Sequence, residues 1–222
     1  MKDDLFDLLL AGLGETVYMV VLSTAVALAL GLPLGIILVA TEKGHILEAP
    51  RLNKVLGTFI NIVRSFPFII LIVVLLPLSR FIVGTTLGAT AAVVPLSIGS
   101  APFLARIIEN SLKEIGTGKI EAAQAMGANP FFIIIRVLLP EALPSLVRGV
   151  TLAIITITGF TAVAGAIGAG GLGILAIRFG YMRFRDDIMI ATVAILVLFV
   201  QGVQWGGDFV AKCINRKRYK AD

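Results

Sequence analysis

The chain has 222 residues, of which 58% are hydrophobic and 15% charged, and its formal net charge is +5. Soluble proteins carry about 25% charged residues, and the apolar runs here are too long for a soluble core. Val17–Ala40 contains no charged residue, and Ile188–Val210 contains none before Asp208. Each run exceeds the roughly 20 residues that a helix needs to cross a bilayer. The composition therefore excludes a soluble protein and predicts an integral membrane protein in the lipid bilayer.

The N-terminal residues, MKDDLFD, are acidic and lack the basic region of a cleaved signal peptide. The first apolar run is therefore predicted to remain as a membrane span. The single cysteine, Cys213, excludes an intramolecular disulfide and has no neighbouring metal ligand, and the only histidine, His45, lies in a polar loop. We interpret both as solvated residues and expect no metal site.

Five membrane spans are predicted, at approximately residues 17–40, 56–78, 85–108, 142–164 and 188–210. The start of the second is open: either it begins at Leu56, or Leu56–Phe66 lies along the interface and the crossing begins at Pro67. Pro95 and Pro102 interrupt the third, which neighbouring helices can accommodate. The expected fold is all-α, with a transmembrane domain at 13–210, a long loop at 109–141 and a basic tail at 211–222.

The distribution of lysine and arginine among the loops indicates how the chain is oriented across the membrane. The 41–57 loop, the 105–141 segment and the tail from Ala211 hold three, four and five of them. The N-terminal segment, the 78–84 turn and the 165–187 loop hold one, one and three. The positive-inside rule therefore places the N-terminus outside and the C-terminus in the cytoplasm. The basic tail then faces the anionic inner leaflet, so it does not require a nucleic-acid partner.

The segment EAAQAMGANP, residues 121–130, lies in the long cytoplasmic loop. Its strong helix formers predict a short helix over Ile120–Ala128, with Glu121 in the first turn, where a negative charge suits the helix dipole. Gly127 is predicted to end it, Asn129-Pro130 to start a second, apolar helix, and Pro140 to stop that one. Small side chains suit the first helix to a groove on another protein. The alternative is an ordinary solvated loop helix, but such helices usually carry more charge.

Glu121-Ala122-Ala123, Gly127 and Leu139-Pro140 resemble the EAA-loop signature of permease subunits of binding-protein-dependent ABC importers. The family often has isoleucine where Val137 stands. The resemblance implies a type I ABC importer permease fold in the bacterial cytoplasmic (inner) membrane, and a coupling helix that docks on an ATPase. The coupling residues that it implies are Glu121, Ala122, Ala123, Ala125, Met126, Gly127 and Ala128, and the turn residues are Asn129, Pro130, Leu139 and Pro140.

The chain has no P-loop, because its only Gly-Lys pair, Gly118-Lys119, is followed by Ile120. We therefore expect no catalytic residue and no cofactor in this chain, with ATP and Mg²⁺ on a separate ATPase subunit. Five spans are few for enclosing a solute pathway, so a homodimer is expected. The resemblance implies two such ATPases and an external substrate-binding (lipo)protein.

GAGGLG, Gly168–Gly173, fits the dinucleotide-binding pattern, but it follows a membrane span rather than a strand. We interpret it as a tight re-entrant or extended external segment, and the resemblance implies that it faces the binding protein.

Asn61, Arg64 and Ser65 share one helical face. If the second span begins near Leu56, Arg64 lies inside the membrane and is predicted to line the pathway; if it begins later, Arg64 anchors the inner interface. Further pathway or gate residues are predicted in the fourth span: Thr158, Thr161 and Val163.

Nearly the whole chain resembles methionine-uptake permeases, in stretches such as NIVRSFPFIILIVVLLP, RFIVGTTLGA, LLPEALPSLVRG and GAIGAGGLG. The resemblance implies methionine as cargo, including its D-isomer, moved by alternating access. Another amino acid or a short peptide is the alternative. A stand-alone channel or secondary transporter would require paired intramembrane acids or an inverted repeat, and neither is visible.

Overall fold

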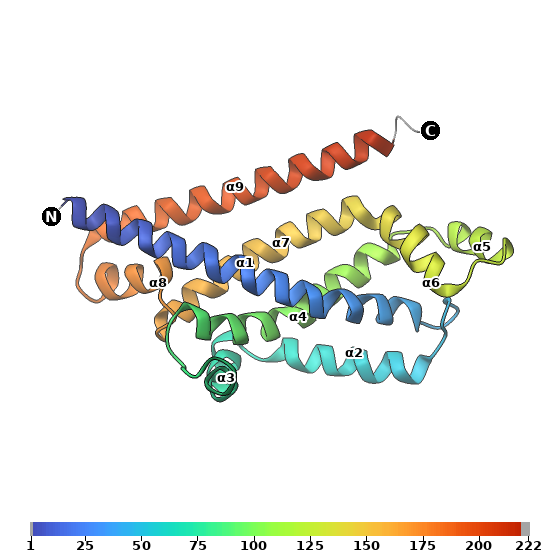
Figure 1. Cartoon of the computed structure of the whole chain (residues 1–222), viewed down its shortest axis with the longest axis horizontal. Coiled ribbons are helices and arrows are strands. Elements are labelled where there is room, and N and C mark those ends of the chain that lie inside the picture. Colours follow the sequence, from blue (N-terminus) through green and yellow to red (C-terminus); the bar gives the residue numbers. More distant parts are fainter. Residues whose placement is uncertain (1, 219–222) are drawn as a thin grey trace. The chain divides into compact units, whose positions relative to one another are not determined.

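The computed structural model describes residues 2–218 and the side chains of residues 5–216. Within this range the chain is helical and contains no strand (Figure 1), which confirms the predicted all-α class. The elements are α1 (Lys2–Ala40), α2 (Pro50–Ser65), α3 (Phe68–Val83), α4 (Ala89–Lys113), α5 (Thr117–Ala125), α6 (Pro130–Ile133), the π-helical η1 (Ile134–Leu138), α7 (Leu139–Ala166), α8 (Gly171–Leu175), the π-helical η2 (Ala176–Tyr181) and α9 (Asp186–Arg218).

The chain forms two compact units, each assembled from three separate stretches. Unit one comprises Met1–Ala27, Phe66–Ser100 and Ala153–Gln204, and unit two comprises Leu28–Ser65, Ala101–Leu152 and Trp205–Asp222. The long helices α1, α4, α7 and α9 each contribute one part to each unit. The predicted basic tail continues α9 as far as Arg218, and its residues 219–222 lie outside the described range.

Four continuous helical stretches among the described residues are long and apolar enough to cross a membrane: Leu5–Ala40, Ala89–Lys113, Pro130–Ala166 and Asp186–Arg216. Helices α2 and α3 make a fifth span only as a broken pair. The predicted second span is therefore not one helix. Helix α2 ends at Ser65, because Pro67 has no N–H to donate and disfavours helical geometry in the residue before it. Pro67 itself has an extended backbone before α3, with φ −55° and ψ 129°.

The predicted stop at Pro140 is wrong. Helix α6 continues through η1 into α7, so Leu139 and Pro140 lie in a helix rather than in a turn. In a regular α-helix the proline ring collides with the carbonyl four residues earlier. Here the preceding turn is π-helical, and the N–H of Leu139 donates to the carbonyl of Ile134, five residues back. This wider turn accommodates the proline without ending the helix.

A buried apolar cluster holds unit one together. It contains Met19 of α1, Ile72 of α3, Leu96 of α4 and Ala164 of α7. The rings of Phe68 and Phe160 stack beside it, with centroids 3.6 Å apart. These contacts explain why α3 packs on α7 although the two are far apart in the chain.

Close helix packing organises unit two. A Cβ atom on Gly35 of α1 would lie 2.7 Å from the backbone oxygen of Ala105 in α4, and one on Gly31 would lie 2.9 Å from that of Ala101. Only glycine permits this approach, since any Cβ would force the two helices apart. The Gly31-x₃-Gly35 spacing is a signal for such packing that our sequence analysis did not use.

Candidate functional site

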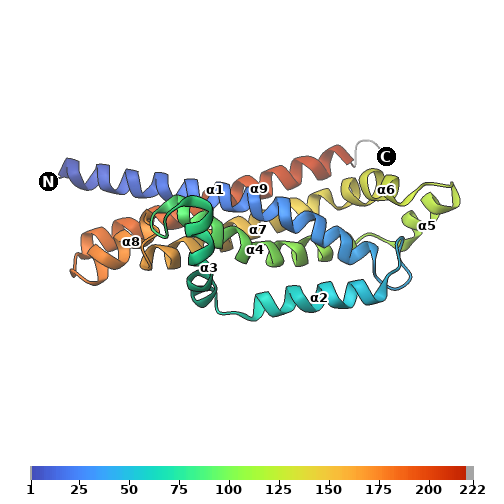
Figure 2. The same ribbon diagram turned by 60° about the horizontal axis from the view of Figure 1, so that its bottom comes forward.

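Helix α5 and its flanking turns form the loop that carries the EAA-like signature. The helix spans Thr117–Ala125, about three residues earlier than predicted. Gly127 follows it with φ +79°, and the Asn129 side chain accepts a hydrogen bond of 2.8 Å from the backbone N–H of Phe132. Pro130 occupies the first turn of α6. Both predicted turn signals are confirmed, and α5 lies beside α6 in both views (Figures 1 and 2).

The two faces of α5 have different surroundings. Ile120 and Ala123 are buried in an apolar cluster that also contains Leu138, Ala142 and Leu146. The other face is exposed and carries Glu121, Ala122, Gln124, Ala125 and Met126. Ala123 is only 4% exposed, because residues three apart share a helical face and Ala123 follows Ile120 toward the core. Its predicted role in docking stays a prediction. Glu121, Ala122, Ala125, Met126 and Gly127 remain available to a partner.

An open depression of about 470 Å³ lies at the C-terminal end of α5. Its lining consists of Ala123, Met126, Gly127, Ala128, Asn129, Phe132 and Val137. Met126 is 82% exposed, and Phe131, next to this lining in sequence, is 72% exposed. Large apolar side chains gathered on an exposed surface mark interaction sites. The end of α5 therefore has the shape and polarity of a protein contact.

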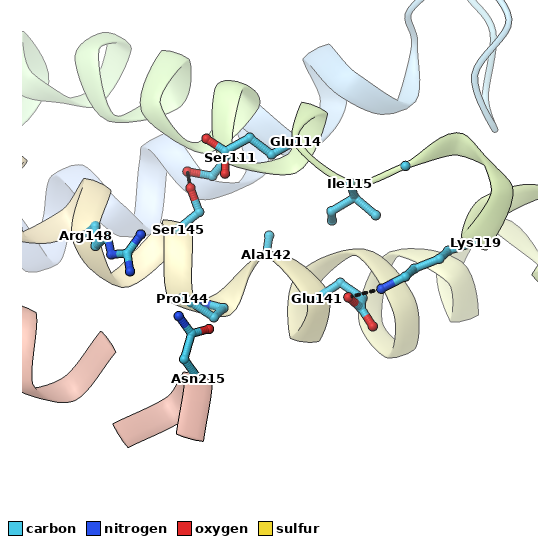
Figure 3. A pocket seen from close by; sticks show the side chains of 11 residues that line it. Ser111, Glu114, Ile115, Lys119, Glu141, Ala142, Pro144, Ser145, Arg148 and Asn215 are labelled. Atoms are coloured by element: carbon cyan, nitrogen blue, oxygen red, sulfur yellow. Dashed lines mark hydrogen bonds and ion pairs between the residues drawn. The ribbon is translucent and has the colours of Figure 1, made fainter. Parts of the chain in front are cut away.

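A second, more polar cavity of about 310 Å³ lies where α4, α5, α7 and α9 meet within unit two (Figure 3). Lys119 of α5 and Glu141 of α7 form an ion pair there, with Nζ and Oε2 2.6 Å apart. One turn further along α7, Ser145 donates a hydrogen bond of 3.2 Å to Ser111 of α4. The Lys119–Glu141 pair could not be predicted from the sequence, because two residues 22 positions apart across a loop leave no periodic signal.

Asn61, Arg64 and Ser65 lie at the end of α2, in unit two. Asn61 accepts a hydrogen bond of 3.0 Å from Arg106 of α4, and Ser65 donates to the backbone oxygen of Asn61 at 2.8 Å. The Arg64 side chain is exposed and forms no hydrogen bond or ion pair with any other described residue. The helix ends directly after Ser65. This geometry is the one expected if the crossing begins at Pro67.

Arg106 belongs to a charge network that our sequence analysis missed. It pairs with Glu109 at 2.6 Å, and Glu109 also pairs with Lys113 at 3.0 Å. Lys113 reaches Glu42, beyond the end of α1, at 2.9 Å. Arg106 additionally donates to the backbone oxygen of Gly57 at 3.0 Å. The i, i+3 and i+4 spacing of the three α4 residues was the available signal, and the network ties α2 and the α1–α2 loop to α4.

Thr158 and Thr161 lie on α7 in unit one, with Val163 half-buried nearby. Both threonines are almost fully buried, at 3% and 2% exposure. Their hydroxyls donate to the backbone oxygens of Ile154, at 2.8 Å, and Thr158, at 2.7 Å. Their donors are therefore used inside their own helix.

The glycine-rich segment packs against α1. Gly170 and Gly171 have φ of +89° and +74°. The N–H of Gly171 donates to the Glu15 carboxylate at 2.6 Å, and that of Leu172 donates to the Thr16 hydroxyl at 2.9 Å. The segment is as tight as predicted and leads into a helix without a preceding strand, so it does not form the dinucleotide-binding arrangement.

Known proteins are similar to this chain in sequence and in backbone structure. A probable D-methionine transport system permease protein, MetI of Vibrio cholerae, is 48% identical over 211 residues, which cover 95% of this chain and 94% of that protein. The methionine import system permease protein MetP of Bacillus subtilis is 43% identical over 181 residues, 82% of each chain. A chain from inward-facing structures of the MetNI methionine ABC transporter matches with a TM-score of 0.95 and 43% identity, over 96% of this chain and 99% of that one.

The last of these matches confirms the expected type I importer permease fold. Residues 31–216 match the family described as binding-protein-dependent transport system inner membrane component. The chain therefore belongs to this family, as a permease subunit of an ABC transporter of the inner membrane.

Proposed function

We propose that this chain is the membrane-spanning subunit of an ATP-driven importer that carries methionine, as the D- and L-isomers, into the cytoplasm by alternating access. The observation that carries the cargo is the similarity to permeases named for methionine or D-methionine transport, at 43–48% identity over most of their length. Another amino acid or a short peptide is the competing cargo.

The exposed face of α5 is the proposed contact with a cytoplasmic ATPase. It offers one carboxylate, Glu121, beside the small Ala122 and Ala125 and the apolar Met126. Gly127 and the depression beyond it extend the surface. Small residues allow close backbone approach by a partner, and the exposed methionine adapts to the shape of an apolar groove. ATP and Mg²⁺ belong to the ATPase in this proposal.

Two copies of the chain, two ATPases and an external substrate-binding (lipo)protein make up the proposed importer. The N-terminus lies outside and the C-terminus in the cytoplasm, as the distribution of lysine and arginine indicates. Arg64 is the proposed anchor at the inner membrane interface, and the glycine-rich segment is the proposed external face toward the binding protein.

Uptake by the reconstituted complex tests this function. Proteoliposomes that contain the permease, its ATPase and its binding protein should accumulate labelled L-methionine when ATP is present on the ATPase side. Unlabelled D-methionine should compete, whereas a panel of other amino acids and dipeptides should not. Uptake of a different solute in place of methionine would refute the cargo and leave the importer standing. Methionine uptake without any ATPase would refute the importer.

A further inference from the structure

Helix α5 is connected to α7 in two ways. Along the chain, the route passes through the turn at Gly127, the four residues of α6 and the π-helical η1. The turn and the π-helical segment both interrupt regular α-helical hydrogen bonding. Across space, Ile120 and Ala123 of α5 pack in one apolar cluster with Ala142 and Leu146 of α7. Beside this packing, an ion pair of 2.6 Å joins Lys119 in the first turn of α5 to Glu141 in the first turn of α7.

Apolar packing supports the ion pair. Ile120, next to Lys119, is buried in the same cluster as Ala142, next to Glu141. Glu141 is 28% exposed and Lys119 is 55% exposed, and both line the cavity of Figure 3. An ion pair this exposed contributes little to global stability, so its removal should leave the fold intact. Its position suits it to hold two helices in a fixed relation.

We infer that the Lys119–Glu141 pair is a positioning contact that makes α5 and the first turn of α7 move as one body. The inference rests on the proposed role of α5 as the ATPase contact. A displacement of α5 then reaches the spanning helix directly, without passing through Gly127 and η1. Loss of the pair should leave ATP hydrolysis running while less solute is moved per ATP.

Neutralising either partner tests the contact. In reconstituted complexes, Lys119→Met and Glu141→Gln should each lower the methionine taken up per ATP hydrolysed by at least about fivefold, a typical size for coupling between sites. The exchanged pair Lys119→Glu with Glu141→Lys should restore most of the ratio. The matched control is Glu42→Gln, which breaks the Lys113–Glu42 pair of 2.9 Å and does not touch α5; its ratio should be unchanged.

A covalent link between α5 and α7 tests whether the two helices can stay joined throughout the transport cycle. Cysteines at positions 119 and 141, in a Cys213→Ser background, are joined by a short bifunctional thiol reagent. The unlinked double-cysteine variant lacks the ion pair and should show the lowered uptake per ATP. If the two helices move as one body, the linked complex should regain the ratio of the Cys213→Ser parent. Lost uptake in the linked complex would overturn the inference, because the helices would then have to separate during the cycle.

The remaining outcomes separate the inference from the proposed function. A parent complex that takes up no methionine contradicts the proposed function. An active parent whose neutralised variants keep the normal ratio contradicts the inference alone. Neutralised variants that no longer retain the ATPase in a pull-down also overturn it, because the pair would then shape the docking surface itself.

Discussion

Single residues set the geometry at the end of α5. Gly127 has φ +79°, and a Cβ atom placed there would meet nothing within 4 Å. The requirement for glycine is therefore conformational rather than steric. Non-glycine residues pay roughly 1–2 kcal/mol for this left-handed conformation, and asparagine tolerates it better than most. The direction in which α5 leads into α6 depends on this residue.

Gly127→Leu should insert and assemble normally but lose most ATP-driven uptake, because the strained turn reorients the exposed face of α5. Gly127→Asn is the matched control and should keep most of the activity. Glu121→Lys should also lose uptake, since it reverses the one charge on that face without straining the backbone. ATP-driven uptake is measured in vesicles that contain equal amounts of each complex. Normal uptake by both Gly127→Leu and Glu121→Lys would refute the docking role of α5.

His45, in the loop between α1 and α2, gives stability a dependence on pH. Burial lowers the pKa of His45 below its ordinary value of 6.5; nearby Lys113 lowers it further, and Glu42 partly opposes this. Its Nδ1 is buried without a hydrogen-bond partner. Because the folded chain binds this proton less readily than the unfolded chain, the contribution of His45 to stability is complete above pH 6.5 and is lost as the pH falls below it.

The melting temperature of the His45→Gln variant should therefore fall less than that of the parent when the pH is lowered from about 7.5 to about 5.5. Thermal unfolding of the detergent-purified protein measures this difference. The control Lys43→Gln changes an exposed neighbour in the same loop and should keep the parent's pH dependence. Identical pH profiles for His45→Gln and the parent would show that His45 makes no such contribution.

At the scale of elements, the approach of α1 to α4 in unit two leaves little room for a larger residue. Gly35 of α1 faces the backbone oxygen of Ala105 at a distance that no Cβ atom fits. Gly14, in the same helix, has open space around it. The two glycines are thus equivalent in helix propensity and opposite in packing.

Gly35→Ala should destabilise the protein by about 1–3 kcal/mol, the usual cost of overpacking. Gly14→Ala should be neutral or stabilising by up to about 1 kcal/mol, because alanine favours a helix over glycine. Melting temperatures of both variants in one detergent compare the two effects. Equal shifts would mean that α1 and α4 are not held as closely as the structure shows.

At the scale of the whole molecule, the orientation across the membrane remains a prediction from charge. Arg183, in the turn before α9, should lie outside, whereas Cys213, near the end of α9, should lie in the cytoplasm. Both residues are exposed in this chain. Opposite accessibility at the two ends of α9 would therefore report its direction across the bilayer.

An Arg183→Cys variant in a Cys213→Ser background should react with a membrane-impermeant thiol reagent added to intact cells. The parent, whose only cysteine is Cys213, should react only after the membrane is opened. Labelling of Cys213 in intact cells would reverse the assigned orientation.

The sequence by itself determined the features that depend on local physics. The apolar length of each run predicted the helices, and the Gly127–Pro130 signals predicted where α5 ends and α6 begins. A short motif, Glu121-Ala122-Ala123 with Gly127, indicated the family. The break near Pro67 was visible as an alternative, because proline constrains its own neighbours in the chain. None of these features requires knowledge of what lies across space.

Only the tertiary structure decided the features that depend on distant neighbours. Pro140 remains helical because a π-helical turn precedes it, and Ala123 is buried because α5 lies on the apolar cluster of unit two. Asn61 is held by Arg106, and Lys119 by Glu141, across separations of 45 and 22 residues. The composition of a segment does not encode such pairings. They are set by how helices pack, which is why only the folded chain shows how α5 is attached to α7.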